Sequence, residues 1–280
     1  MPKPPRFAKG RMYGTEISGV AWIDLLGYGA MLRPVRFNPS HASAQLAVHR
    51  LQEFHSIALK HVNRSLRALI LNDGIAFVRE MSPRSRTVTF DFVARVFAAF
   101  QAINEEDQSA GHPGARCIVA AGARLRTDEP MKLNPIKLAS ILTRHRQGAI
   151  TCQQAIAEAF AYGPIAGGSV PLQANFAFTK AYLADASGSE AGLKGPRFFL
   201  DAAFCSSEPS WFDIGNRIKW EVEGMSAEFL ELKSIDNVAA GASGHNHLRN
   251  AAEIARKLGI DFPGPRIPRR RHRQTIFDPS

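Results

Sequence analysis

Two aspartates in this sequence directly follow apolar stretches. Asp24 comes after residues 20–23, which read as a buried strand, and Asp73 lies at the tip of an expected hairpin whose strands are residues 67–71 and 75–80. An unpaired buried charge costs on the order of several kcal/mol, so each carboxylate needs a cation, hydrogen-bond donors or a metal. If the hairpin lies beside the first strand, both carboxylates reach the same sheet edge. A divalent metal there would offset both charges.

The residues after Asp24 suit a metal and a phosphate. Hard divalent cations take oxygen ligands, which include backbone carbonyls such as that of Leu25. Gly27 and Gly29 place no side chain in the way of a phosphate approaching the backbone amides. Tyr28 has two interpretations: it packs in the core, or its ring lines a nucleotide pocket with its hydroxyl at a phosphate.

Periodicity predicts the elements that position these residues. The order is strand, helix (43–62), hairpin, helix (87–107) and strand (115–126). A helical stretch, a late helix (174–186), a strand (196–204), a second hairpin (217–235) and a closing helix ended by Gly259 follow. This interleaving predicts one α/β domain with a mixed sheet over residues 15–261, with a helical insertion at 130–162. A Gly- and Pro-rich loop at 161–171 precedes the late helix.

The net charge of +10 is concentrated at the two ends of the chain. Residues 1–11 and 262–280 each carry +4, which leaves +2 for the 250 residues between them. The tails, residues 1–14 and 262–280, are expected either to be solvated or to contact a polyanion such as nucleic acid. No apolar run reaches the roughly 18 residues that cross a bilayer, and no signal peptide is evident, so a cytoplasmic protein without membrane contact is expected.

Several motifs resemble those of one enzyme family. The stretches "AWIDLLGYGAM" and "LILNDGIAFV" resemble the paired metal-binding aspartate motifs of class III nucleotidyl cyclases. "IVAAGARLR" resembles the central strand of that family, and "NFAFTKAYLADA" resembles the helix that carries its transition-state groups. "GPRFFLD" is similar to a strand of small bacterial relatives that include the pyrimidine cyclases of Pycsar anti-phage defence. The resemblance implies a ferredoxin-like α/β (α+β) fold, with a mixed, mainly antiparallel sheet and helices on one face.

The sequence departs from this family at three positions. Adenylyl and guanylyl cyclases carry an Asn and an Arg on the late helix, where this chain has Thr179 and Leu183. Leu69 occupies the position of the Lys that reads a purine. These differences argue against synthesis of cAMP or cGMP. Either the protein makes another cyclic nucleotide with different groups, or it is an inactive relative that binds nucleotide or a partner.

The resemblance implies a uridylate or cytidylate cyclase that forms a 3′,5′-cyclic nucleotide and pyrophosphate. Asp24, Asp73 and the Leu25 carbonyl would hold two Mn²⁺ or Mg²⁺ ions per site. The nucleotide would contact Leu26, Gly27, Tyr28, Gly29 and Thr179. Arg197, Lys180 and Arg33 are the candidates for the transition-state cation. The resemblance further implies a homodimer, and a product that acts on a downstream effector in antiviral defence; binding of nucleic acid is not expected.

Overall fold

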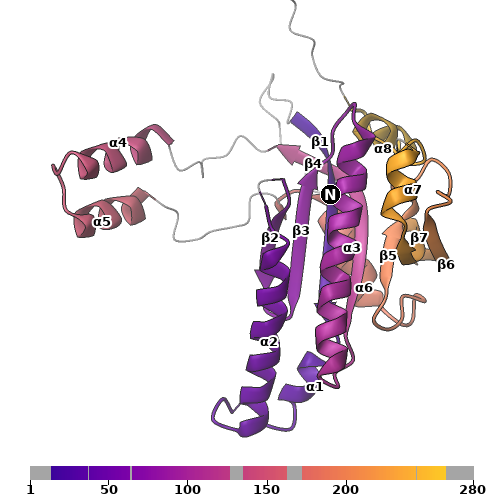
Figure 1. Cartoon of the computed structure of the whole chain (residues 1–280), viewed down its shortest axis with the longest axis horizontal. Helices are drawn as coiled ribbons and strands as arrows, with labels where there is room; N and C mark the ends of the chain where they lie inside the picture. The colour runs from indigo at the N-terminus through magenta and orange to yellow at the C-terminus, as the bar shows by residue number, and fades with distance from the viewer. Residues whose placement is uncertain are drawn as a thin grey trace, which may run out of the picture.

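The computed structural model describes residues 14–36, 38–63, 65–126, 135–162, 172–243 and 245–262 (Figure 1). Apart from their border residues, the predicted basic tails and the loop at 161–171 lie outside these ranges. The elements in chain order are β1 (Gly14–Leu25), α1 (Tyr28–Leu32), α2 (Ala42–Lys60), β2 (Arg67–Leu71), β3 (Gly74–Glu80), α3 (Arg86–Ser109), β4 (Ala115–Arg126), α4 (Pro135–Arg146), α5 (Cys152–Tyr162), α6 (Phe176–Ser187), β5 (Phe198–Asp201), the 3₁₀-helix η2 (Ala202–Phe204), β6 (Phe212–Val222), β7 (Met225–Ile235), α7 (Asn237–Ala242) and α8 (Ala251–Lys257).

The strands form one seven-stranded sheet in the order β2-β3-β1-β4-β5-β7-β6. Neighbouring strands are antiparallel except for β4 and β5, which are parallel. The first four strands with α2 and α3 follow the β-α-β-β-α-β order of a ferredoxin-like fold. The predicted fold class, a mixed and mainly antiparallel α/β fold, is therefore confirmed.

Helices cover both faces of the sheet, so the expectation of helices on one face is wrong. Ile17, Ala21 and Ile23 of β1 join the large core that includes residues of α2, α3 and α8. Trp22, which points to the other face because side chains alternate along a strand, packs in a second core with Ala181 of α6. The central strands are apolar on both faces, and each face therefore needs cover. Figure 1 shows α2 and α3 side by side along the sheet.

The region of the predicted helical insertion forms α4 and α5, joined by a turn in which Gly148 has a φ of 72°. The two helices pack on each other around Ile141, Ile150 and Ala155, and Figure 1 shows them as a hairpin. The boundaries of a single domain at 15–261 stay a prediction. Among the described residues, no helix is both long and apolar enough to cross a bilayer.

Candidate active site

Asp24 and Asp73 lie at the same end of neighbouring strands. In the antiparallel pair of β1 and β3, Asp24 is opposite Gly74, and the Leu25 amide donates to the Asp73 carbonyl at 2.9 Å. Asn72 has a φ of 57°, a left-handed conformation that Asn tolerates in tight turns. Its side-chain amide nitrogen Nδ2 donates to Asp73 Oδ1 at 3.1 Å. The hairpin thus brings the Asp73 turn beside the end of β1, as the sequence predicts.

Trp22 links this edge to α6. Its indole lies so close to Gly74 that a Cβ at that position would be 2.1 Å from a ring carbon, so the turn needs glycine there. The indole Nε1 donates to Asp185 Oδ2 at 3.2 Å in the buried space between β1 and α6. Asp185 is therefore a third carboxylate near the sheet edge.

Arg116 is the buried cation of the site. It lies opposite Asp24 in the pairing of β1 and β4, and its Nε donates to Asp185 Oδ1 at 2.6 Å. Its two terminal nitrogens donate to the Asp185 carbonyl at 2.9 Å and to the Leu193 carbonyl at 3.0 Å. The side chains of Arg116 and Asp185 are 11% and 10% exposed. These bonds hold the C-terminal end of α6 and the segment after it against β4.

Burial and neighbouring carboxylates raise the pKa of Asp24 and of Asp185. Burial, and then the charges of Asp185 and Asp73, raise the pKa of Asp24 to about 7, although Arg116 opposes the rise. Burial also raises the pKa of Asp185, against the hydrogen bond and charge of Arg116. One guanidinium shared among three carboxylates leaves this edge in need of positive charge.

The chemistry of Asp24 and Asp73 fits a hard divalent cation. Within the described ranges, the Asp24 carboxylate has no hydrogen-bond or ion-pair partner, and Asp73 Oδ1 accepts only from Asn72. A bound metal would supply the positive charge that neither carboxylate receives from a neighbouring side chain. In the described part of the chain, no group of three or more His, Cys, Asp or Glu side chains is arranged to bind a metal. The predicted site accordingly relies on two carboxylates and a backbone carbonyl.

The raised pKa of Asp24 predicts a pH-dependent stability without metal. The group has a pKa of 3.8 as its ordinary value and about 7 in the folded protein, so the folded state binds the proton more tightly. Stability is therefore expected to fall as the pH rises from about 4 to about 7, by at most about 4 kcal/mol, and to stay low above that range. Urea unfolding of the wild type and of Asp24→Asn at pH 5 and pH 8 measures this. The wild type should lose more stability than the variant, and equal losses would contradict the burial of this charge.

The turn after β1 places the other predicted nucleotide contacts. Gly27 has a φ of 75°, and α1 follows it directly. A Cβ at Gly29 would meet nothing within 4 Å, so the backbone is open there. Tyr28 is buried in the large core, and burial and the Asp73 charge raise the pKa of its hydroxyl. The Leu26 carbonyl accepts a hydrogen bond from Arg50 at 2.8 Å.

The candidate cations differ in their surroundings. Lys180 donates to Asp201 Oδ2 and to the Ala121 carbonyl, both at 2.8 Å, and Arg197 lies 3.3 Å from Glu231 Oε2. Arg33 is exposed at the C-cap of α1, with no side-chain partner in the described ranges. Thr179 is exposed on α6 and its hydroxyl donates to the Asn175 carbonyl at 3.4 Å.

Sequence reasoning missed Arg116 and Asp185, which the fold brings to Asp24. Each is a charged residue next to an apolar stretch, which is the pattern that identified Asp24. Arg116 precedes the apolar stretch at 117–121, and Asp185 follows the largely apolar residues 181–184. A charge beside an apolar stretch does not reveal its partner, because these two residues lie 69 positions apart in the sequence.

The fold and this edge define a ferredoxin-like α/β domain with paired strand-terminal carboxylates. No protein-family model matches the chain, and a search of curated proteins finds no match. Among solved structures, the guanylyl cyclase Cya2 is similar, with 11% identity and a TM-score of 0.45, over 81% of this chain and 96% of that chain. The guanylate cyclase domain of RhGC from Catenaria anguillulae in complex with GTP gives 8% and 0.37, over 79% and 98%. The dimeric guanylyl cyclase domain of RhoGC from Blastocladiella emersonii gives 10% and 0.38, over 80% and 99%. Similarity at this level establishes no activity.

Proposed function

We propose that this protein is a metal-dependent nucleotidyl cyclase that converts UTP or CTP to the 3′,5′-cyclic nucleotide and pyrophosphate. The observation that supports this most is the meeting of Asp24 and Asp73 at one sheet edge, beside the turn at Gly27 and the start of α1, which contains Gly29. The motif resemblance to class III cyclases includes both of these aspartates and both glycines. Antiviral signalling through a downstream effector and a homodimer are parts of the proposal that rest on this resemblance, whereas the cytoplasmic location is the expectation drawn from the sequence pattern.

In the proposed site, Asp24, Asp73 and the Leu25 carbonyl would hold Mn²⁺ or Mg²⁺. A bound divalent ion supplies Lewis-acid chemistry: it lowers the pKa of the ribose 3′-hydroxyl and neutralises charge on the triphosphate. Asp24 and Asp73 position the reacting groups, and the open backbone at Gly29 admits the phosphates. Trp22 and Arg116 hold the Asp185 end of α6 against the same edge.

A pyrimidine substrate is proposed because Leu69 occupies the position of the Lys that reads a purine in related cyclases. Leu69 lies in β2 with its side chain half-buried, opposite Ala76 of β3. A leucine offers no charge or hydrogen bond to a purine base, and a site without such groups does not select for one. The identity of the pyrimidine follows from the assay below.

A catalytically inactive nucleotide-binding module is the second candidate. It is favoured because two of the three candidate cations are already paired, Lys180 with Asp201 and Arg197 with Glu231. If the protein is active, Arg33 is the candidate that we propose for the transition-state cation. Arg33 follows α1 directly, so its exposed side chain starts one short helix away from Gly27.

The deciding experiment incubates the purified protein separately with ATP, GTP, UTP and CTP in the presence of Mn²⁺. We expect a cyclic product and pyrophosphate from UTP or CTP, and little from ATP or GTP, by liquid chromatography with mass spectrometry. Nucleotide binding is measured in parallel by calorimetry with Ca²⁺ in place of Mn²⁺. Binding without product from any of the four nucleotides would favour the inactive module, whereas neither binding nor product would refute both candidates.

A further inference from the structure

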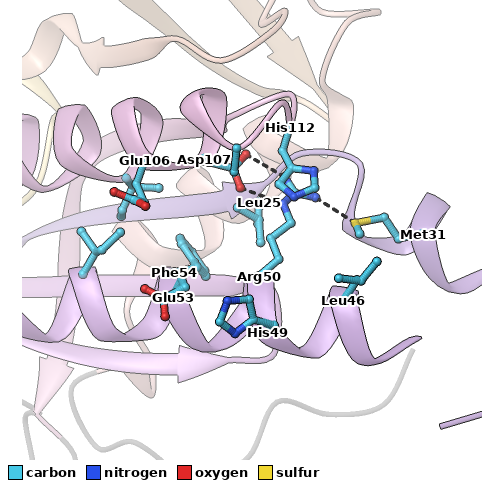
Figure 2. Close-up of a pocket in the computed structure, with 13 residues that line it drawn as sticks. Leu25, Met31, Leu46, His49, Arg50, Glu53, Phe54, Glu106, Asp107 and His112 are labelled. Carbon is cyan, nitrogen blue, oxygen red and sulfur yellow. Dashed lines mark hydrogen bonds and ion pairs between the residues drawn. The ribbon is translucent and has the colours of Figure 1, made fainter. Parts of the chain in front are cut away.

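A cavity lies between α2 and α3, next to the sheet edge that carries Asp24 and Asp73, which is called the metal edge because of the proposed metal site. Its volume is about 430 Å³, large enough for a small organic molecule. Its walls are mainly apolar and include Leu25, Met31, Phe54 and Ile103. Figure 2 shows side chains from both helices pointing into the space between them. Apart from Leu25, no residue of the predicted metal site or of the proposed nucleotide contacts lines this cavity.

The charge of the cavity is negative. Arg50 is neutralised by Asp107, whose two oxygens lie 2.7 and 2.9 Å from it, and these side chains are only 4% and 6% exposed. Glu53 of α2 and Glu106 of α3 also line the cavity, and Figure 2 shows them on facing helices at the end away from Met31. Neither of these two carboxylates has a side-chain hydrogen bond or ion pair with any residue that the structure describes. Two exposed, unpaired acids therefore face each other across an apolar trough.

We propose that this cavity binds a small organic amine with an apolar body. The apolar walls would take the body, and Glu53 and Glu106 would take the ammonium group. Charge complementarity favours this class of ligand over an organic anion, because the cationic Arg50 is already bonded to Asp107. An uncharged apolar ligand would leave the two facing acids without a partner.

Arg50 connects the cavity to the metal edge. Its Nη2 donates to the Leu26 carbonyl at 2.8 Å, two residues after Asp24, and its Nη1 lies 3.5 Å from the sulfur of Met31 in α1. Figure 2 shows Arg50 extending from α2 between Asp107 and Met31. A ligand that packs on Arg50 and Met31 therefore contacts Met31, which follows the turn at Gly27, and a side chain bonded to Leu26, which precedes it. This link makes the amine a regulator of the site, and this part of the inference rests on the proposed function.

The binding test uses dansylcadaverine, a fluorescent apolar amine, and N-dansyl-6-aminohexanoate, which replaces the amine with a carboxylate. The titrations use the full chain at pH 8. We expect saturable, blue-shifted binding of the amine and at least tenfold weaker binding of the carboxylate. Glu53→Gln and Glu106→Gln should each weaken amine binding about threefold, and the double variant about tenfold. The matched control is Glu105→Gln, a neighbouring exposed acid of α3 outside the cavity, which should change nothing.

A blocking variant keeps the test independent of charge. Ala110 is exposed at the end of α3 and lines the cavity, so Ala110→Trp should fill the space and abolish amine binding. Equal binding of amine and carboxylate, or unchanged binding in the double Gln variant, would overturn the proposal. Absence of saturable binding, together with a smaller sedimentation coefficient for Ala110→Trp, would show that a second copy of the chain covers this face and would also overturn it.

The regulatory link has its own readout. Saturating dansylcadaverine should change the rate of cyclic-nucleotide formation at least twofold in the wild type and leave it unchanged in Ala110→Trp. An unchanged wild-type rate would refute the link through Arg50. Because amine binding is measured by fluorescence without substrate, failure of the proposed cyclase activity cannot be confused with failure of this site.

Discussion

Replacement of Asp73 by alanine is expected to reduce the proposed metal-dependent formation of cyclic nucleotide at least about a hundredfold, because it removes half of the carboxylate charge proposed to hold the metal. Asp24→Asn should have an effect of similar size, since it keeps the shape of the side chain and removes its charge. Both variants should keep the fold, because Asp73 lies in a hairpin turn and an uncharged residue at position 24 relieves the repulsion from Asp73 and Asp185. The rate of pyrophosphate release with UTP or CTP and Mn²⁺ measures the effect.

The matched control is Asp213→Ala, an exposed aspartate of β6 with no side-chain partner in the described ranges. This variant should retain the wild-type rate. Circular dichroism of all three variants confirms that they are folded before rates are compared. Activity of Asp73→Ala within threefold of the wild type would contradict the assignment of the metal ligands.

Replacement of Arg116 by leucine is expected to cost about 3 to 5 kcal/mol of stability, the range found when one partner of a buried ion pair is removed. The loss would leave the buried Asp185 carboxylate without its cation, and would also remove the donors to the Asp185 and Leu193 carbonyls. It would further remove the charge that opposes the raised pKa of Asp24. Urea unfolding at pH 8 measures the change in the free energy of unfolding.

Two comparisons make this result specific. Arg217→Leu breaks two exposed ion pairs, with Glu208 and Glu228, and should cost far less stability than Arg116→Leu, because solvent screens exposed charges. Asp185→Asn added to Arg116→Leu should recover part of the lost stability, because it removes the uncompensated charge. The side-chain oxygen of the Asn can still accept the hydrogen bond from Trp22 Nε1. A loss below about 1 kcal/mol for Arg116→Leu, or no recovery in the double variant, would show that this pair does not stabilise the site.

The sequence alone identified the two acids of the proposed metal site, because the evidence for them is local. Asp24 follows a run of buried residues, and Asp73 sits in an Asn-Asp-Gly turn between two apolar stretches, a pattern that fixes a hairpin within a few residues. The order of strands and helices predicted one α/β domain with a mixed sheet, and the motif resemblance implied the ferredoxin-like arrangement that the strand order shows.

Only the tertiary structure decided which distant charges become partners. Arg116 pairs with Asp185, and Lys180, a candidate transition-state cation, pairs with Asp201. It also decided that α6 covers the second face of the sheet, and that α2 and α3 leave a negatively charged cavity between them. Periodicity reports how one segment is buried, whereas ion pairs and cavities depend on how segments far apart in the chain meet. That information is present in the sequence only through the packing of the whole fold.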